Sequence, residues 1–427
     1  MAGIRALFLA NGAALGVFYP FIAVILAGRG FAPAAIGVVT AASSFAFTLA
    51  VPVWSHLADV ALGRRVALAL SGLGAAGCLV VAAAPVPDLV VAAAFVGFST
   101  FECAWGPLGD AIAVNAVRDQ ARDYARVRLL SSVGFAITAT GAGFVYDATG
   151  YGPAYLACAA LAIVLVASTR FVPDLPLADL AAIRRRSQGG ARGAAGGRRR
   201  GDGDRGRWVA RRGGSFGTAL RVEPRLGGAL AAIFLVHLGV IAGWTFLPLR
   251  LVELGGQPSD VALSSAISAF AEIPGMLLAA ALATRIGIRG MFAVCAAAYA
   301  ACFASWIVID VPVLIIATRV VTGLAFAGMW VGSVLTMSIL LPPRLQGTGQ
   351  GLYQVTAFGV AAVVANALGG VVYGSAGSGV LFGGALVLVL LGAVAVLAWL
   401  PRRGEAAMGE PVAALETPVP LVPGAVG

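Results

Sequence analysis

One hydrophilic segment divides this chain of 427 residues, and almost unbroken apolar sequence lies on either side of it. Residues 184–225 hold 13 of the 29 basic residues, in a Gly-rich context that opens RRRSQGGARGAAGGRRRGDGDRGRWVARR. A segment so polar and so rich in glycine cannot bury a core of its own. We therefore expect a disordered linker, residues 176–225, between two similar folded halves.

The composition of the remaining chain is that of a protein surrounded by lipid. Hydrophobic residues make up 60% of the sequence and charged residues only 11%, whereas a water-soluble domain needs roughly a quarter of its residues charged. The net charge of +10 is compatible with nucleic-acid binding, but the arginines stand at the ends of apolar runs, which is the pattern of positive-inside topology. We expect membrane lipid around the protein and no nucleic-acid partner.

The apolar runs are long enough to cross a bilayer, which takes about 20 residues each. Reading between polar breaks gives twelve spans: 5–28, 34–57, 66–86, 88–115, 126–147, 152–172, 227–251, 260–283, 289–308, 311–340, 350–373 and 378–400. The sequence thus predicts an all-α integral membrane protein with twelve transmembrane helices in two pseudo-symmetric six-helix bundles. The predicted divisions are an N-terminal bundle 1–175, the linker 176–225, a C-terminal bundle 226–403 and a C-terminal tail 404–427.

The arginines also predict which way the chain crosses the membrane. They gather on alternate loops, at 64–65, 118–126, 184–225, 285–289, 344 and 402–403. By the positive-inside rule this side is cytoplasmic, so both termini are expected there. We expect a multi-pass protein of the plasma (inner) membrane.

The two halves repeat one another in sequence. LAGRGFAPAAIGVVTAASSFAF, after the first span, parallels LVELGGQPSDVALSSAISAFAE, after the seventh, and Pro33 matches Pro258. A six-plus-six repeat joined by a long loop is a recurring transporter architecture, in which the substrate site lies near the bilayer midplane between the halves.

Several segments resemble the major facilitator superfamily, in particular the branch that contains lactose permease and its nucleoside and phenylpropionate proton symporter relatives. The segments are GVFYPFIAVIL, WSHLADVALGRR, DYARVRLLSSVGFAITATGAG, FAEIPGM and LPPRLQGTGQGLYQ. The resemblance covers about residues 10–400 without the linker. It implies the twelve-helix major facilitator fold and transport by alternating access.

Glu272 is the first candidate site residue, because it sits near the middle of the eighth span. An ionisable group in lipid is costly and is a functional candidate by default. A carboxyl group there suits proton binding or hydrogen bonding to a substrate, and the resembled branch has a substrate-binding acid on this helix. The alternative is an internal salt bridge between two helices.

Asp110 and Arg128 are 18 residues apart, at the cytoplasmic ends of the fourth and fifth spans. In lactose permease an acid and an arginine at matching places and with this spacing engage the sugar, so the resemblance implies a substrate-binding pair. The alternative is a structural pair that closes the cytoplasmic side.

Other polar and aromatic residues complete the candidate sites. Glu102 lies two turns before Asp110 on roughly the same helix face and is a candidate for proton coupling. His237, central in the seventh span, is a proton acceptor in one interpretation and a hydrogen-bonded packing residue in the other. Trp330 and Tyr353 are the aromatic residues we expect to stack on a substrate ring.

The loop after the second span carries a different kind of site. Asp59, Arg64 and Arg65 match the superfamily's loop between its second and third spans, so the resemblance implies a conformational gate that breaks when the inner side opens. A further comparison limits the resemblance: where lactose permease has a His and a Glu for proton coupling, this chain has Thr322 and Ala325. Protons, if used, must be handled by Glu272, Asp110, Glu102 or His237.

The sequence therefore predicts a secondary transporter that moves a small organic solute, such as a sugar, a nucleoside or an aromatic acid, in symport with protons. We expect a monomer without cofactor or metal. No nucleophile elbow, P-loop or metal cluster is visible, so an enzyme is not expected. The alternatives are a drug or metabolite exporter driven by proton antiport and a non-transporting membrane sensor that keeps the fold.

Overall fold

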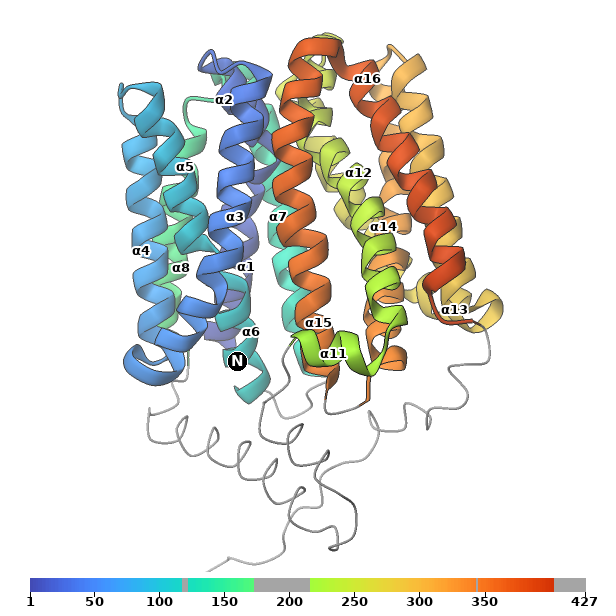
Figure 1. Cartoon of the computed structure of the whole chain (residues 1–427). Coiled ribbons are helices and arrows are strands. Elements are labelled where there is room, and N and C mark those ends of the chain that lie inside the picture. Colours follow the sequence, from blue (N-terminus) through green and yellow to red (C-terminus); the bar gives the residue numbers. More distant parts are fainter. Residues whose placement is uncertain (117–121, 173–215, 343–344, 403–427) are drawn as a thin grey trace, which may run out of the picture.

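The computed structural model describes residues 1–116, 122–172, 216–342 and 345–402. In this part of the chain every regular element is a helix, and the long helices stand side by side (Figure 1). Most of the predicted linker and all of the predicted tail lie outside the described residues.

The first half of the chain folds into these helices: α1 (Ala2–Gly16), α2 (Ile22–Gly28), α3 (Pro33–Leu57), α4 (Arg64–Ala83), α5 (Asp88–Glu102), α6 (Trp105–Ala116), α7 (Arg122–Thr149) and α8 (Ala154–Ser168). Two 3-10 turns, η1 (Tyr19–Phe21) and η3 (Thr169–Phe171), and one π-helical turn, η2 (Ala58–Leu62), join or extend them.

The second half folds into these elements: α11 (Phe216–Val222), α12 (Arg225–Glu253), α13 (Pro258–Val308), α14 (Pro312–Leu340), α15 (Gln346–Gln354), the π-helical turn η5 (Val355–Val360) and α16 (Ala361–Trp399). α13 and α16 each contain one glycine with a positive φ, Gly287 at 76° and Gly377 at 84°, where the helix direction changes. Only glycine adopts this backbone conformation without strain.

Eleven helical segments of the described chain are long and apolar enough to cross a membrane. The last of them, Gln346–Trp399, has 54 residues. At 1.5 Å per residue it would measure about 80 Å, far more than the roughly 30 Å of a bilayer core. Figure 1 shows that it runs along the bundle and returns, so Gly377 separates two crossings. The predicted all-α membrane fold with twelve transmembrane helices is confirmed.

Two of the crossings are broken near mid-membrane, between α1 and α2 and between α5 and α6. A break frees backbone carbonyls, which in lipid must find another donor. The Tyr146 hydroxyl donates to the Val17 carbonyl at 2.9 Å in the first break. The Trp54 indole Nε1–H donates to the Thr100 carbonyl at 2.8 Å beside the second. Both breaks are thus stabilised by side chains of neighbouring helices.

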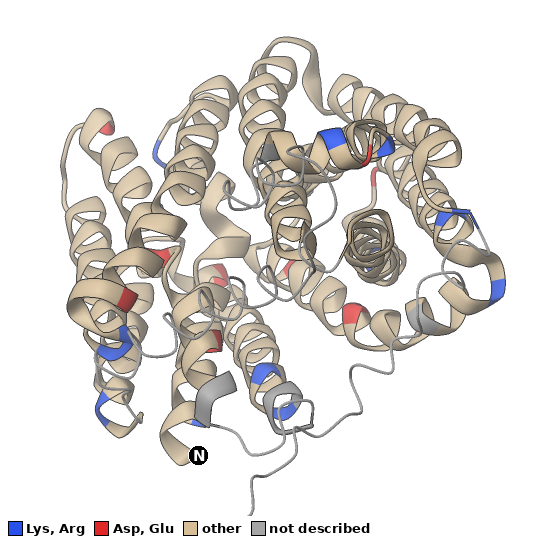
Figure 2. Ribbon diagram, turned by 60° about the horizontal axis from the view of Figure 1, so that its bottom comes forward, with Lys and Arg blue, Asp and Glu red and all other residues tan. Residues whose placement is uncertain are grey.

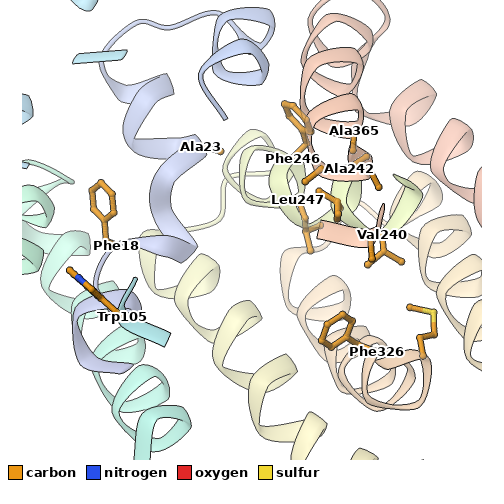
Figure 3. Packing of buried hydrophobic residues seen from close by; sticks show 14 of the residues in the cluster. Phe18, Ala23, Trp105, Val240, Ala242, Phe246, Leu247, Phe326 and Ala365 are labelled. Atoms are coloured by element: carbon orange, nitrogen blue, oxygen red, sulfur yellow. The ribbon is translucent and has the colours of Figure 1, made fainter. Parts of the chain in front are cut away.

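The helices pack mainly within their own half of the chain, α1 on α7 and α8, α4 on α5 and α8, α12 on α16, and α13 on α14. Figure 3 shows the buried side chains in two groups, with Phe18 and Trp105 on one side and Phe246 and Leu247 on the other. Between the halves, α3 contacts α16, α7 contacts α13, and α2 contacts α12.

The two ends of the bundle differ. One end carries the N-terminus and the last turn of α6 (Figure 1). The opposite end carries six short turns, around residues 30, 85, 151, 255, 310 and 377, and we call it the six-turn end. Charged residues are few on the ribbon, and several of them lie near another charged residue (Figure 2).

Candidate functional site

A cavity of about 460 Å³ lies between the two halves of the chain. The first half contributes residues of η1, α2, α3, α5 and α7, and the second half contributes residues of α12, α13, α14, η5 and α16. Because each half supplies about one side of its wall, any movement of one half relative to the other changes the shape of the cavity.

The wall combines hydroxyl and amide groups with aromatic rings. The neutral polar residues that line it are Thr40, Ser43, Ser44, Ser99, Thr245, Ser265, Ser268 and Asn366. The aromatic residues that line it are Tyr19, Phe47, Phe95, Phe98, Phe135, Trp244 and Phe358. Such a surface offers hydrogen bonds to a polar solute and flat apolar faces to a ring.

Two charged residues of the described chain line the cavity, Glu272 on α13 and Arg319 on α14, and both belong to the second half. They interact electrostatically. Arg319 is buried, and its Nη1–H donates to Thr322 Oγ1 at 2.9 Å while its Nε–H donates to the Ser264 carbonyl at 3.3 Å. These bonds hold the Arg319 guanidinium in the same cavity wall as Glu272, near enough for the two charges to interact.

Asn366 on α16 links the two halves across the cavity wall. Its side-chain Oδ1 accepts a hydrogen bond from Thr245 Oγ1 at 2.7 Å, within the second half. Its Nδ2–H donates to Ser44 Oγ at 3.2 Å, on α3 of the first half. Both partners also line the cavity, so a solute that competes for these groups would loosen a contact between the halves.

Tyr19 and Glu102 meet on the first half's side of the cavity. The Tyr19 hydroxyl donates to Glu102 Oε2 at 2.9 Å. Tyr19 lines the cavity and keeps 39% of its surface exposed, whereas Glu102 is only 6% exposed. The predicted proton-coupling candidate Glu102 is therefore buried behind Tyr19. Tyr19 is the residue that connects Glu102 to the cavity.

The halves contact one another closely toward the six-turn end. The Ser259 backbone N–H, in the first turn of α13, donates to Asp147 Oδ1 on α7 at 2.8 Å. On the opposite side of the interface, a Cβ atom added to Gly37 of α3 would lie only 2.7 Å from the Gly370 Cα of α16. These two helices can approach so closely only because both residues are glycine.

Two of the predicted site groups lie outside the cavity lining, toward the end opposite the six-turn end. Arg128 Nη1 and Asp110 Oδ1 are 3.4 Å apart in a half-exposed ion pair. Arg64 Nε bonds Asp59 Oδ1 at 3.1 Å, and its Nη1–H donates to the Ala111 carbonyl at 3.1 Å. Arg64 thereby joins the turn after α3 to α6. The role of Asp110 and Arg128 in substrate binding stays a prediction. The role of Asp59, Arg64 and Arg65 in gating also stays a prediction.

The predicted residues His237, Trp330 and Tyr353 form one cluster beside the cavity. The Trp330 ring lies 5.9 Å from Tyr353, and the His237 ring lies 6.0 Å from Tyr353. His237 is fully buried, and its Nδ1 bonds the Ile233 carbonyl of its own helix at 2.8 Å. Phe358 packs against all three and is the ring that reaches the cavity. A direct solute contact by Trp330 or Tyr353 stays a prediction.

Sequence reasoning did not assign roles to Arg319 or Tyr19, although both line the cavity. Arg319 carried the same signal as Glu272, a charge inside an apolar run, and could have been found by it. Tyr19 carried none, because aromatic residues are ordinary in spans. Its contact with Glu102 joins residues 83 positions apart.

A cavity with polar groups among its aromatic and apolar residues, enclosed between two six-crossing halves of a helical membrane protein, is the architecture of a secondary transporter. The sequence profile of the MFS_1 like family matches residues 4–383, and the chain belongs to this family. It is an MFS transporter.

Individual relatives agree with this assignment. The chain is 26% identical to a maltose permease of Geobacillus stearothermophilus over 364 residues, which are 84% of each protein. Among solved structures, a mutant of the nucleoside transporter NupG superimposes with a TM-score of 0.77 at 17% identity, over 93% of this chain and 99% of that one. A D-xylose-proton symporter gives a TM-score of 0.66 at 13% identity, over 95% and 97%.

Proposed function

We propose that the protein carries a small polar organic solute across the plasma membrane in symport with protons, by alternating access. Sugars, nucleosides and aromatic acids are the solute classes that we consider. The observation that carries the proposal is the cavity between the halves, where Glu272 and Arg319 stand among hydroxyl groups and aromatic rings. The names of the relatives, a maltose permease, a nucleoside transporter and a D-xylose-proton symporter, support the same range.

The chemistry of the wall supports binding of a solute with both hydroxyl groups and a flat face. Ser265 and Ser268 on α13 and Thr40 on α3 offer donors and acceptors from opposite halves. Arg319 offers the fork of N–H donors that suits neighbouring hydroxyls or a carboxylate. The aromatic rings cover the apolar face of a sugar or a base.

Glu272 is the residue to which we assign proton coupling in this cavity. As a carboxylate it is balanced by Arg319. Protonation removes that balance and leaves the guanidinium free to bind the solute, so proton and solute favour one another's binding. Such mutual favouring is the thermodynamic requirement for coupling two binding events.

We assign the end with the N-terminus to the cytoplasm and the six-turn end to the outside, because the arginine-rich loops of the sequence lie on the former side. The halves 1–175 and 226–403 then rock against each other around the cavity, and the contacts Asp147–Ser259 and Gly37–Gly370 close the outer side. We infer that the structure is an outward-closed state of a protein that acts as a monomer.

The test is solute-induced proton movement in proteoliposomes supplied in turn with maltose, D-xylose, uridine and phenylpropionate. We expect proton influx with one of them, and its loss in Glu272→Gln. Glu223→Gln is the matched control, because Glu223 precedes α12 and does not line the cavity. It should leave the influx unchanged.

Other outcomes would redirect the assignment. Silence with all four solutes in folded protein contradicts the symport proposal, and proton-driven expulsion of hydrophobic cations would then identify an exporter. A biological response that survives Glu272→Gln but needs the Arg-rich segment would identify a sensor.

A further inference from the structure

The first half of the chain holds a buried carboxyl group that the coupling scheme above does not use. Glu102 ends α5 at the break in the fourth crossing, and Tyr19 lies in the break of the first crossing. The two breaks face each other, and the hydrogen bond of 2.9 Å from Tyr19 to Glu102 bridges them. The breaks cost helical hydrogen bonds, and the bonds from Tyr146 and Trp54 described above stabilise them. The side chains of neighbouring helices therefore stabilise the arrangement that brings Tyr19 and Glu102 together.

Within the described residues, the surroundings of Glu102 contain no cation. Glu102 forms no ion pair there, and the titratable groups that interact with it are the Tyr19 hydroxyl and the thiols of Cys103 and Cys158. Both thiols donate to backbone carbonyls, those of Thr100 and Ala14. Tyr19 is then the group that stabilises Glu102 when it is charged. This differs from Glu272, which has Arg319 beside it.

Tyr19 faces two ways, because it lines the solute cavity and holds Glu102 at once. A phenol hydroxyl has one proton to donate. A solute oxygen that accepts this proton takes the bond away from Glu102, and a buried carboxylate without a hydrogen bond is strongly disfavoured.

We propose that Tyr19 and Glu102 form a second proton-binding site, in the first half, whose occupancy is set by whether the Tyr19 hydroxyl bonds Glu102 or the solute. When the solute takes the Tyr19 hydroxyl, the Glu102 carboxylate accepts a proton from cavity water and becomes a neutral carboxylic acid. The phenol keeps its own proton throughout. When the solute leaves, Tyr19 bonds Glu102 again and the proton returns to water. Glu102 is the proton acceptor, and Tyr19 is a positioning residue that acts through it.

The first experiment uses the proton alone as its probe, so that no transported solute has to be known. Infrared difference spectra are recorded on Glu272→Gln protein in proteoliposomes as the pH is lowered. We expect a carboxylic-acid band that disappears on adding Glu102→Gln and shifts on adding Tyr19→Phe. Tyr155→Phe is the matched control, because it removes another tyrosine hydroxyl of the same aromatic core. A band indifferent to both Glu102→Gln and Tyr19→Phe overturns the proposal.

The second experiment separates coupling from transport and rests on the proposed symport. Maltose, D-xylose and uridine are each tested for exchange at equal pH and for accumulation driven by a pH gradient. With the transported solute, Tyr19→Phe should lower gradient-driven accumulation at least tenfold more than it lowers exchange, because the lost hydroxyl weakens solute binding in both assays and uncouples the proton only in the first. Full accumulation in Tyr19→Phe, or an equal loss of exchange and accumulation, overturns the proposal.

Failure of the proposed function gives a different pattern. If wild-type protein moves no protons with any of these solutes, symport is wrong, while the infrared bands still decide whether Glu102 binds a proton under the control of Tyr19. If Tyr19→Phe does not fold, Glu102→Gln in the Glu272→Gln protein still decides whether the band belongs to Glu102.

Discussion

Asp147, at the end of α7, accepts a hydrogen bond at 2.8 Å from the backbone N–H of Ser259, in the first turn of α13. The bond joins the two halves of the chain, and its acceptor is a carboxylate at a helix N-terminus, where negative charge is favoured. It is therefore suited to hold the six-turn end closed, and to be given up when that end opens.

Asp147→Ala should shift the protein toward the outward-open state. The lost bond is exposed and is worth at most about 1 kcal/mol, which corresponds to a change of up to about fivefold in the ratio of the two states. The measurement is the labelling rate of a Ser265→Cys reporter in the cavity wall by a membrane-impermeant thiol reagent added on the six-turn side, in a background without native cysteines.

The matched control for this change is Asp310→Ala. Asp310 lies at the same end and bonds Arg250 at 2.7 Å, but both residues belong to the second half. Its removal should leave the labelling rate unchanged. Equal acceleration in both variants would mean that general loosening of this end, rather than loss of the cross-half bond, exposes the cavity.

Gly37→Ala should hinder closure of the six-turn end. An added Cβ would lie 2.7 Å from the Gly370 Cα, which is backbone and cannot rotate away, so α3 and α16 must separate. We expect faster labelling of the same reporter and at least a tenfold loss of transport. Gly141→Ala on α7 is the control, since a Cβ there meets nothing within 4 Å. Normal transport in Gly37→Ala would show that this contact is not needed for closure.

The membrane-spanning helices could be predicted from the sequence because the lipid bilayer imposes a simple length and polarity requirement on them. Each crossing needs about 20 apolar residues, and runs such as 66–86 and 289–308 can be read directly. The helix breaks at Val17 and Cys103 could not be predicted from the sequence. The backbone carbonyls freed at these breaks accept hydrogen bonds from Tyr146 and Trp54, which are too far away in the sequence for a local pattern to reveal.

Only part of the candidate site could be predicted from the sequence, because the rest depends on how the helices pack. Glu272 was found because a charge inside an apolar run is costly and therefore conspicuous. That it stands beside Arg319 depends on the relative rotation of α13 and α14, which hydropathy does not determine. The aromatic candidates show the same limit: composition cannot tell Phe358, which reaches the cavity, from Trp330 and Tyr353, which pack behind it.

Glu272 and Arg319 should behave as one unit in a double-mutant cycle. Arg319→Gln removes the cation and leaves a carboxylate in a largely apolar wall, and Glu272→Gln leaves a buried guanidinium. Removing one of two interacting charges in such a wall is more destabilising than removing both, because the remaining charge is left unbalanced. Because Glu272 is partly exposed to the cavity, we expect a coupling free energy of about 1–2 kcal/mol.

Thermal unfolding of the two single variants and of Glu272→Gln/Arg319→Gln in detergent measures this coupling. The double variant should be more stable than the sum of the single effects predicts. Strictly additive losses would show that Arg319 is held by Thr322 and Ser264 alone and that Glu272 does not depend on it.

Asp110 and Arg128 allow the two sequence interpretations to be separated by exchanging their charges. The pair lies outside the cavity lining and its atoms are 3.4 Å apart at a half-exposed position, so we expect a structural pair. Asp110→Arg should reduce transport several-fold, because two cations then face each other, and the double variant Asp110→Arg/Arg128→Asp should recover most of the rate. Solute affinity, measured by exchange, should stay close to wild type in the double variant. If each residue instead contacts the solute, exchange of the charges places both groups wrongly, and the double variant would bind no better than the single ones.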